Sequence, residues 1–218
     1  MFFRAFSLVC LAIGVFVLVQ VIAPAFAFKA WELTFLGSNN GNLLVDPNPS
    51  QTIADSQVLG VSVENVGNFT AFVSSSTNSI PYREFSISIP SIKLPKTTVK
   101  VASNEFEHSL AQLPGTALPG EIGNVFISGH SALPQFYSPD NFQAIFSELP
   151  NIKTGDDIEV DALGQHFSYQ VVGLRVVNPS DVWVINPPDG IGRYMSLMTC
   201  VPPGFNTKRL IVLSKLKG

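Results

Sequence analysis

Cys200 is the strongest candidate in this chain for a catalytic nucleophile. It follows a run of apolar residues, and Cys10 lies far away in an uncharged N-terminal stretch, so a disulfide between the two is not expected. In a protein outside the cytoplasm, an unpaired thiol indicates intermolecular pairing or a reactive nucleophile. The alternative is a buried small hydrophobe, which is how most free cysteines behave.

Arg209 and His130 could complete a nucleophilic site around Cys200. Arg209 opens the apolar stretch after Cys200, and a hairpin-like connection would bring both to the same end of a barrel. A guanidinium there could stabilise a thiolate or donate hydrogen bonds to an oxyanion. His130 follows another apolar stretch and could act as general acid or base for the thiol and a leaving amine. The competing interpretation of Arg209 is a simple edge-strand charge.

Short strands must position these side chains. Residues 84–89 are apolar at every second position, as expected for a half-buried strand. Helical stretches are predicted near 105–112 and 142–149, so that His108 lies on a surface helix and His166 at a strand start. Seven or eight strands with one or two short helices predict a mainly β fold, a closed or nearly closed barrel. Further strands are expected at 97–101, 124–128, 157–162, 167–177, 194–199 and 209–216.

Composition excludes several classes of function. The chain has 218 residues, 46% hydrophobic and 13% charged, with a net charge of −3 and no basic block. Binding to nucleic acid needs clustered Lys and Arg, so no nucleic-acid partner is predicted. Two cysteines are too few for a disulfide-dense scaffold or a four-Cys zinc site.

The low charge content is explained by the N-terminal stretch. Positions 5–28 contain no charged residue, and as a helix they would be ~36 Å long, enough to cross the ~30 Å hydrocarbon core of a membrane. We expect residues 1–28 to be an uncleaved signal anchor, a single transmembrane helix in the cell membrane, with the rest outside the cytoplasm. Ala25-Phe26-Ala27 resembles a signal-peptidase site, so cleavage is the alternative.

Residues 29–83 are predicted to be an extracytoplasmic spacer. Polar, turn-prone clusters separate short apolar stretches such as 58–63 and 69–73. Those stretches could also add a strand or two to the domain that follows. Residues 84–218 are predicted to form the catalytic domain.

Over roughly residues 84–216 the chain resembles the sortases, cysteine transpeptidases of bacterial cell surfaces. The resemblance rests on the short strand 86–91, the Ser128-Gly129-His130 turn, Leu197-Met198-Thr199-Cys200 and Arg209-Leu210-Ile211-Val212. Around the nucleophile the family pattern is Thr-Leu-x-Thr-Cys, and here Ser196 stands in the first Thr place. The resemblance implies a sortase-like β-barrel and an N-terminal membrane anchor.

The resemblance also implies a mechanism without a cofactor. Cys200 would attack a carbonyl of a protein's sorting signal, commonly Leu-Pro-x-Thr-Gly, to give a thioester. His130 would protonate the leaving amine and later deprotonate an amine nucleophile from a peptidoglycan precursor or a pilin. Arg209, with a backbone N–H near Thr199 or Cys200, would hold the oxyanion.

Two further features bear on ligands. The loop 178–193 matches the family's specificity loop and could offer an apolar wall for a Leu-Pro pair, or simply form a small core of its own. Three acids on one strand face could suggest calcium, which some sortases bind, but a solvated face explains them as well, and no metal is predicted. The wall residues are Val182, Trp183, Val184 and Ile185, and the acids are Asp157, Glu159 and Asp161.

The sequence also bears on the sortase subclass and on two alternative functions. The short N-terminal part resembles class D or class E sortases, and no Asp-Pro-aromatic motif precedes the barrel. An L,D-transpeptidase would have His, Cys and Arg close together in a Ser-His-Gly-Cys-x-Arg cluster, whereas here His130 lies far before Cys200. A non-catalytic β-barrel surface-assembly module with a decayed site is the other alternative, and the intact set of three residues counts against it.

Overall fold

The computed structural model describes residues 2–31, 61–66, 69–74 and 80–218. Its contacts fall into two compact units, Met1–Asn39 and Asn40–Gly218. Residues 32–60, which make up much of the predicted spacer, lie outside the described residues.

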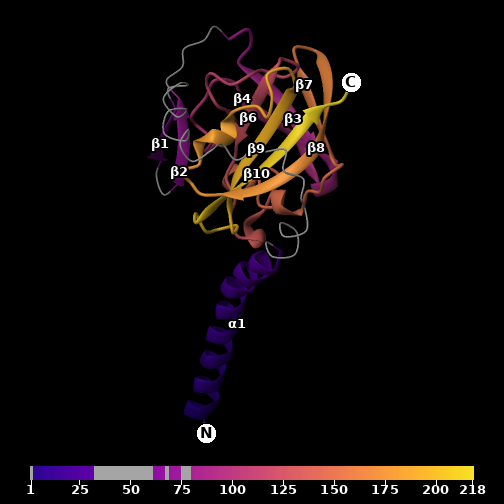
Figure 1. Ribbon diagram of the computed structural model, residues 1–218. Coiled ribbons are helices and arrows are strands. Elements are labelled where there is room, and N and C mark those ends of the chain that lie inside the picture. The colour runs from indigo at the N-terminus through magenta and orange to yellow at the C-terminus, as the bar shows by residue number, and fades with distance from the viewer. Residues whose placement is uncertain (1, 32–60, 67–68, 75–79) are drawn as a thin grey trace. The chain divides into compact units, whose positions relative to one another are not determined.

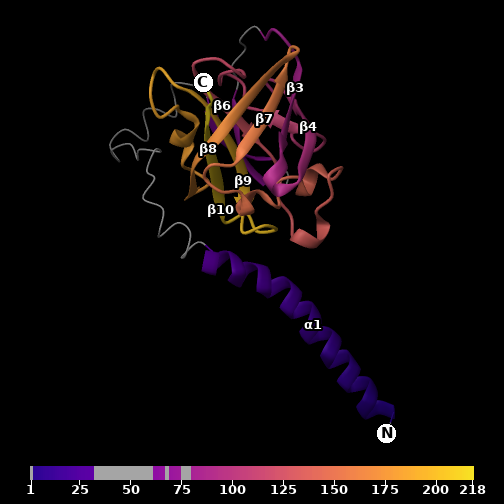
Figure 2. The same ribbon diagram turned by 90° about the vertical axis from the view of Figure 1, so that its right-hand side faces the viewer.

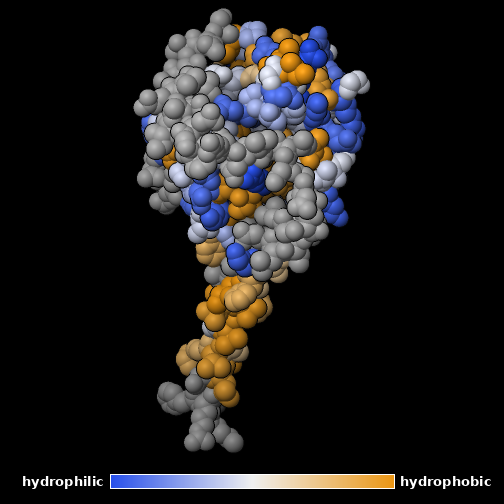
Figure 3. All heavy atoms as spheres, in the orientation of Figure 1, coloured by the Kyte–Doolittle hydropathy of each residue, from blue (hydrophilic) through white to orange (hydrophobic). Residues whose placement is uncertain are grey.

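Within the first unit the structure describes one helix, α1, which runs from Phe2 to Trp31 over 30 residues. Apolar side chains cover most of its described length, and those described are exposed (Figure 3). Among the residues that the structure describes, no helix meets both the length and the hydropathy required of a membrane span.

The second unit is built on a closed barrel of eight strands (Figure 1 and Figure 2). Around the barrel the order is β10-β8-β7-β3-β4-β5-β6-β9, and β9 pairs with β10 to close it. Neighbours are antiparallel except for β4 with β5 and β6 with β9, which are parallel. The mainly β, closed-barrel fold predicted from the sequence is therefore confirmed. The strands are β3 (Glu84–Ile89), β4 (Leu94–Lys100), β5 (Leu110–Gln112), β6 (Gly123–Ser128), β7 (Asp157–Ala162), β8 (Gln165–Val177), β9 (Arg193–Val201) and β10 (Lys208–Leu216).

The prediction of a helix at 105–112 is wrong, because Leu110–Gln112 form strand β5 and residues 105–109 form a loop. Leu-Ala-Gln has good intrinsic helix propensity, but β4 and β6 need a strand between them to close the barrel, and tertiary pairing overrides propensity. His108 is exposed, as predicted, but in this loop.

The second predicted helix, at 142–149, is present only as two 3₁₀ turns, η4 (Phe142–Ala144) and η5 (Leu149–Asn151). Asn141 caps η4 by accepting a hydrogen bond from the backbone N–H of Gln143. Three more 3₁₀ turns punctuate the described chain, η2 (Pro90–Ile92), η3 (Pro134–Phe136) and η6 (Val182–Ile185).

A separate antiparallel hairpin, β1 (Val61–Val66) with β2 (Phe69–Ser74), lies within the range predicted as spacer. Its Val61 and Phe72 are buried among barrel residues. The predicted apolar stretch 69–73 lies within β2, and residues 61–63 of the stretch 58–63 lie in β1.

The strands β6, β9 and β10 are buried along nearly their whole length, so both of their faces are covered. The outer face is identified by a core cluster that also contains hairpin and η6 residues, with Phe126 from β6, Met198 from β9 and Ile211 from β10. Side chains alternate along a strand, so the residues between these point into the barrel. This outer face carries the candidate site.

Candidate active site

Cys200 and Arg209 lie directly opposite each other on β9 and β10. Directly opposed residues of antiparallel strands project on the same face, so the thiol and the guanidinium are neighbours. Cys200 is two residues after Met198 and therefore shares its outer face. The sequence predicts Cys200 at the end of a strand, as either a reactive nucleophile or a buried small residue. The structure leaves it only 1% exposed, one position before the end of β9.

The turn that carries His130 lies beside the Cys200 end of β9, because β6 runs parallel to β9 and ends where Ser128 pairs with Met198. The turn after β6 is fastened to β9 on both sides of the histidine. Before it, the backbone N–H of Gly129 donates to the Met198 carbonyl at 3.1 Å. After it, the Ser131 hydroxyl donates to the Cys200 carbonyl at 2.6 Å.

Gly129 is required by close packing beneath this turn. A Cβ at this position would lie 2.6 Å from both Leu110 Cδ2 and Phe146 Cδ2, inside van der Waals contact. Any side chain would force Leu110, Phe146 or the turn itself to shift. The Ser-Gly-His sequence thus has a steric cause.

Thr199 lies on the opposite face of β9 from Cys200, because successive residues alternate. Its hydroxyl donates to the Gly129 carbonyl at 2.9 Å and is fully buried. The Thr199 side chain therefore supports the turn that holds His130 and faces away from a carbonyl attacked by Cys200. The predicted backbone donor at Thr199 or Cys200 remains a prediction.

Arg209 is fully buried, and the loop between β9 and β10 fixes its side chain. Its Nη1 donates to the carbonyl oxygens of Asn206 at 3.3 Å and Lys208 at 3.0 Å. A planar fork held in this way beside a thiol is suited to directional hydrogen bonding.

Burial decides the protonation states of Cys200 and His130. It raises the pKa of the Cys200 thiol to about 12, although the Arg209 charge acts in the opposite direction. Burial also lowers the pKa of His130, while Glu107 opposes that shift. With the cysteine pKa high and the histidine pKa low, both side chains are neutral at pH 7 in this arrangement.

Phe106 and Val73 were missed by the sequence analysis. The Phe106 ring lies 4.8 Å from the His130 ring at 62°, and it forms a buried cluster with Ala111 and Cys200. Val73 of β2 packs against this cluster. No local signal identifies either contact, since each joins segments that are distant in sequence.

The four predicted wall residues form η6, which covers part of the outer face. Val184 and Ile185 are buried in the cluster that contains Met198, and Val182 and Trp183 pack against it. Arg175 Cζ lies 4.9 Å from the centroid of the Trp183 ring. These residues join the barrel cluster. Their contact with substrate remains a prediction.

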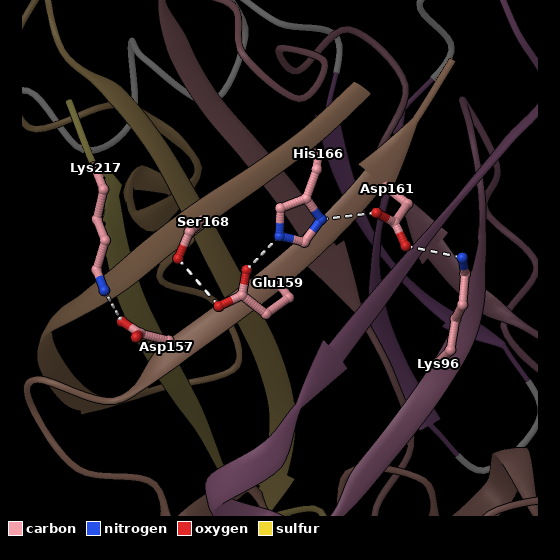
Figure 4. A network of polar contacts seen from close by, with 7 residues as sticks. All are labelled: Lys96, Asp157, Glu159, Asp161, His166, Ser168 and Lys217. Carbon is pink, nitrogen blue, oxygen red and sulfur yellow. Dashed lines mark hydrogen bonds and ion pairs between the residues drawn. The ribbon is translucent and has the colours of Figure 1, made fainter. Parts of the chain in front are cut away.

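The three strand-face acids of β7 are engaged with cations and a hydroxyl (Figure 4). Asp157 pairs with Lys217 at 2.6 Å, and Asp161 with Lys96 at 2.8 Å. His166 bridges Asp161 at 2.8 Å and Glu159 at 2.9 Å. The Lys96 hydrogen bond lowers the pKa of Asp161, and the hydrogen bond to Asp161 raises that of His166. Within the described residues, no group of three or more His, Cys, Asp or Glu side chains is arranged to hold a metal ion.

The known proteins that this chain resembles in sequence and in structure are sortases. The profile of the Sortase domain family matches residues 85–217. Sortase A of Bacillus anthracis is 28% identical over 135 residues, 61% of this chain and 59% of that protein. Sortase SrtE1 of Streptomyces coelicolor is 30% identical over 109 residues, 46% of this chain and 29% of that protein. The chain therefore spans less than two thirds of the length of these curated relatives.

A solved structure shows the same likeness in three dimensions. Sortase A from Corynebacterium diphtheriae superposes with a TM-score of 0.54 at 30% identity, covering 63% of this chain and 61% of that one.

Proposed function

The chain belongs to the sortase family, and from this premise we propose that it is a membrane-anchored transpeptidase whose nucleophile is Cys200. The observation that carries the proposal is the register of β9 and β10, which sets Cys200 against Arg209 where the His130 turn is fastened. An L,D-transpeptidase is disfavoured by the family match. A non-catalytic assembly module would have no use for a thiol opposite a guanidinium with the turn of a histidine fastened to the same strand.

In the proposed reaction, Cys200 Sγ attacks a carbonyl of a sorting signal of the Leu-Pro-x-Thr-Gly type while His130 takes the thiol proton. Arg209 donates hydrogen bonds to the resulting oxyanion. The tetrahedral intermediate collapses to a thioester, and His130 gives its proton to the leaving amine. An amine from a peptidoglycan precursor or a pilin then attacks the thioester. It loses its proton to His130 and forms the new amide as the thiolate leaves and is reprotonated.

The residues of η6 are proposed to contact the apolar part of the sorting signal. They lie on the outer face that carries Cys200, and Val182 and Trp183 are only partly buried there. A class D-like or class E-like form of the enzyme is proposed from the short N-terminal part, and the match to Sortase SrtE1 supports the class E-like alternative. Residues 84–218 are proposed as the catalytic domain and 29–83 as the connection to α1.

The proposed function is tested with the full chain, a Leu-Pro-x-Thr-Gly peptide and an oligoglycine amine. We expect a thioester adduct on the proteolytic fragment that contains Cys200, followed by a product joined to the oligoglycine. A peptide of the same composition in scrambled order is the control. Absence of both adduct and joined product, with Cys200 shown to be reduced, would contradict the proposal.

Membrane attachment through α1 is proposed from the uncharged positions 5–28 and from the cell-surface chemistry of the family. We expect the mature protein to keep these positions, with residues 29–218 on the outer side of the cell membrane. Mass spectrometry of the membrane-extracted protein measures the N-terminus. A mature chain that begins at Phe28 would show cleavage after Ala27 and would refute the anchor.

A further inference from the structure

Ser109 immediately precedes β5, and the register of β5 with β6 leads it to His130. The two strands are antiparallel, with Ala111 directly opposite Ser128. In an antiparallel pair, each step back along one strand is matched by a step forward along the other. Two steps beyond this pair, the same register sets Ser109 opposite His130.

Two contacts show that the segments stay close beyond the paired residues. Leu110 Cδ2 lies 2.6 Å from the place that a Cβ on Gly129 would occupy, so these two residues are opposed as the register requires. On the other side of Ser109, the Phe106 ring centroid lies 4.8 Å from that of His130. Because Ser109 stands between Phe106 and Leu110 in the chain, its backbone is confined beside the turn that carries His130.

The side chain of Ser109 adjoins the cluster that contains Cys200. Side chains alternate along a strand, so Ser109 shares the face of Ala111, which is two residues later. Ala111 forms a buried cluster with Phe106 and Cys200. His130 contacts the same cluster through the ring of Phe106. Ser109 and His130 therefore border one buried cluster from opposed positions of neighbouring segments.

The hydroxyl of Ser109 is buried without a hydrogen bond. The residue is 2% exposed, and within the described part of the chain its Oγ has no hydrogen-bond partner. Buried polar groups are nearly always paired, because an unpaired one loses its hydrogen bonds to water and gains none in return. An unpaired hydroxyl beside a group that changes its charge during a reaction points to a partner that exists in only one of the two charge states.

Protonation of His130 creates such a partner. A neutral imidazole has one N–H donor, whereas an imidazolium has two. Burial lowers the pKa of His130, which means that the charged ring is poorly solvated where it lies. A hydroxyl oxygen that accepts from a charged N–H makes a stronger hydrogen bond than it would with a neutral donor. The Ser109 hydroxyl would thus stabilise the imidazolium more than the neutral ring.

Three titratable groups near the imidazole have different effects. Glu107 raises the pKa of His130 through its charge, from an exposed position in the same loop where water screens it. Cys200, in the Phe106 cluster, is the group that gives up its proton in the proposed reaction. Arg209, opposite Cys200, is a cation with donors only and cannot accept from the ring.

We propose that Ser109 is a positioning residue for the acid–base step, and that its hydroxyl accepts a hydrogen bond from the imidazolium of His130 once that ring has taken the thiol proton. The proton stays on His130 until it passes to the leaving amine, and the hydroxyl then loses its partner again. The acid–base role of His130 rests on the proposed function, whereas the placement of Ser109 rests on register, burial and contacts.

The test measures the pKa of His130 directly in the full chain. The ring ¹H–¹³C NMR signals of the three histidines are followed as a function of pH, without any peptide. His108→Gln and His166→Gln assign the other two signals. Because no substrate is present, the result does not depend on the proposed function.

Three variants give the comparison. Ser109→Ala removes the hydroxyl, and Ser109→Thr keeps one in the same place. Ser196→Ala is the matched control for the His130 pKa. Ser196 is also fully buried with an unpaired hydroxyl among the described residues, but it lies on β9 opposite Leu213 of β10. A thermal melt of each variant shows that the barrel remains folded.

We expect Ser109→Ala to lower the pKa of His130 by about one pH unit, because a hydrogen bond to the charged form is lost. Ser109→Thr and Ser196→Ala should leave this pKa near the wild-type value. A merely structural role for Ser109 predicts the opposite sign, since water that enters a loosened site would solvate the imidazolium and raise the pKa. An unchanged or raised pKa of His130 in folded Ser109→Ala would overturn the proposal.

Peptide turnover separates this inference from the proposed function. Neutral His130 is the base, so activity is lost as the pH falls through its pKa. The acid limb of kcat/KM for a Leu-Pro-x-Thr-Gly peptide should therefore move to lower pH in Ser109→Ala. The plateau of kcat/KM should fall roughly ten-fold, as the imidazolium formed in the transition state is less stabilised. Ser109→Thr should restore both.

The two measurements can fail independently. If the pKa of His130 falls as expected but no protein turns over the peptide, the placement of Ser109 stands and the proposed function is contradicted. If the wild-type protein turns over the peptide but Ser109→Ala leaves the pKa unchanged, the proposed function stands and this inference is overturned.

Discussion

Replacement of Cys200 by alanine should abolish both thioester formation and cleavage of a sorting-signal peptide. In the proposed mechanism the Cys200 sulfur is the nucleophile, and strand pairing holds it directly opposite Arg209. Loss of a catalytic nucleophile lowers kcat on the order of 10⁴-fold or more in enzymes of comparable chemistry. The measurement is single-turnover formation of the acyl-enzyme, followed by mass spectrometry.

Two controls make the result specific. Cys10→Ala removes the other, exposed thiol and should leave turnover unchanged. Cys200 is buried beside Phe106 and Ala111, so Cys200→Ala leaves a small cavity and should cost about 1 kcal/mol of stability, visible as a slightly lower Tm. Near-parental turnover by a folded Cys200→Ala variant would eliminate the thioester mechanism.

Arg209→Lys should be severely impaired although it keeps the positive charge. The guanidinium is anchored by the Asn206 and Lys208 carbonyls and presents a planar set of donors beside Cys200. An ammonium cannot reproduce that geometry. Loss of one oxyanion donor typically costs ~10²–10³ in rate, and we expect kcat/KM to fall by that amount in Arg209→Lys and at least as much in Arg209→Ala.

The alternative role for Arg209 is purely electrostatic, and it predicts a different pattern. If its charge only stabilises the Cys200 thiolate, Arg209→Lys keeps most of the activity, while Arg209→Ala raises the pH at which Cys200 becomes alkylated. Lys208→Ala is the matched control, because it removes the adjacent charge but keeps the backbone carbonyl that Arg209 uses. A lysine variant within a few-fold of wild type would refute the directional role.

Burial of the Cys200 thiol should make its alkylation depend on pH. Burial raises the pKa of Cys200 to about 12. The rate at which Cys200 is alkylated in the wild-type protein should therefore increase with pH throughout the neutral range. Kinetic comparisons among Arg209 variants are therefore cleanest at one fixed pH.

Seven of the eight barrel strands were predictable, because the residue pattern that identifies each of them lies within the strand itself. The alternation of apolar and polar residues at 84–89 and 157–162 gives β3 and β7 with the predicted bounds, and Gly, Pro and Asn mark the turns. The candidate site residues were found in the same way. Cys200, His130 and Arg209 each stand at or near the end of an apolar stretch, where a strand delivers a side chain to a fixed place.

Other features depended on contacts between distant segments. Strand β5 was missed, because three residues of helix-favouring type become a strand only when β4 and β6 lie on either side of them. The short apolar stretch 69–73 did not reveal that β2 would pack against Cys200. Sequence order also gave no indication that the ring of Phe106 would contact that of His130.

The sequence by itself determined the fold class and the identities of three candidate catalytic residues. Both follow from residue type and from the periodicity of two that any strand imposes on its side chains. Only the tertiary structure decided which face of β9 carries Cys200, that this face is buried, and that the hairpin contributes to the burial. Burial removes water from around a thiol and so raises its pKa, and solvent access is set by which segments pack over a strand, a property that no local pattern encodes.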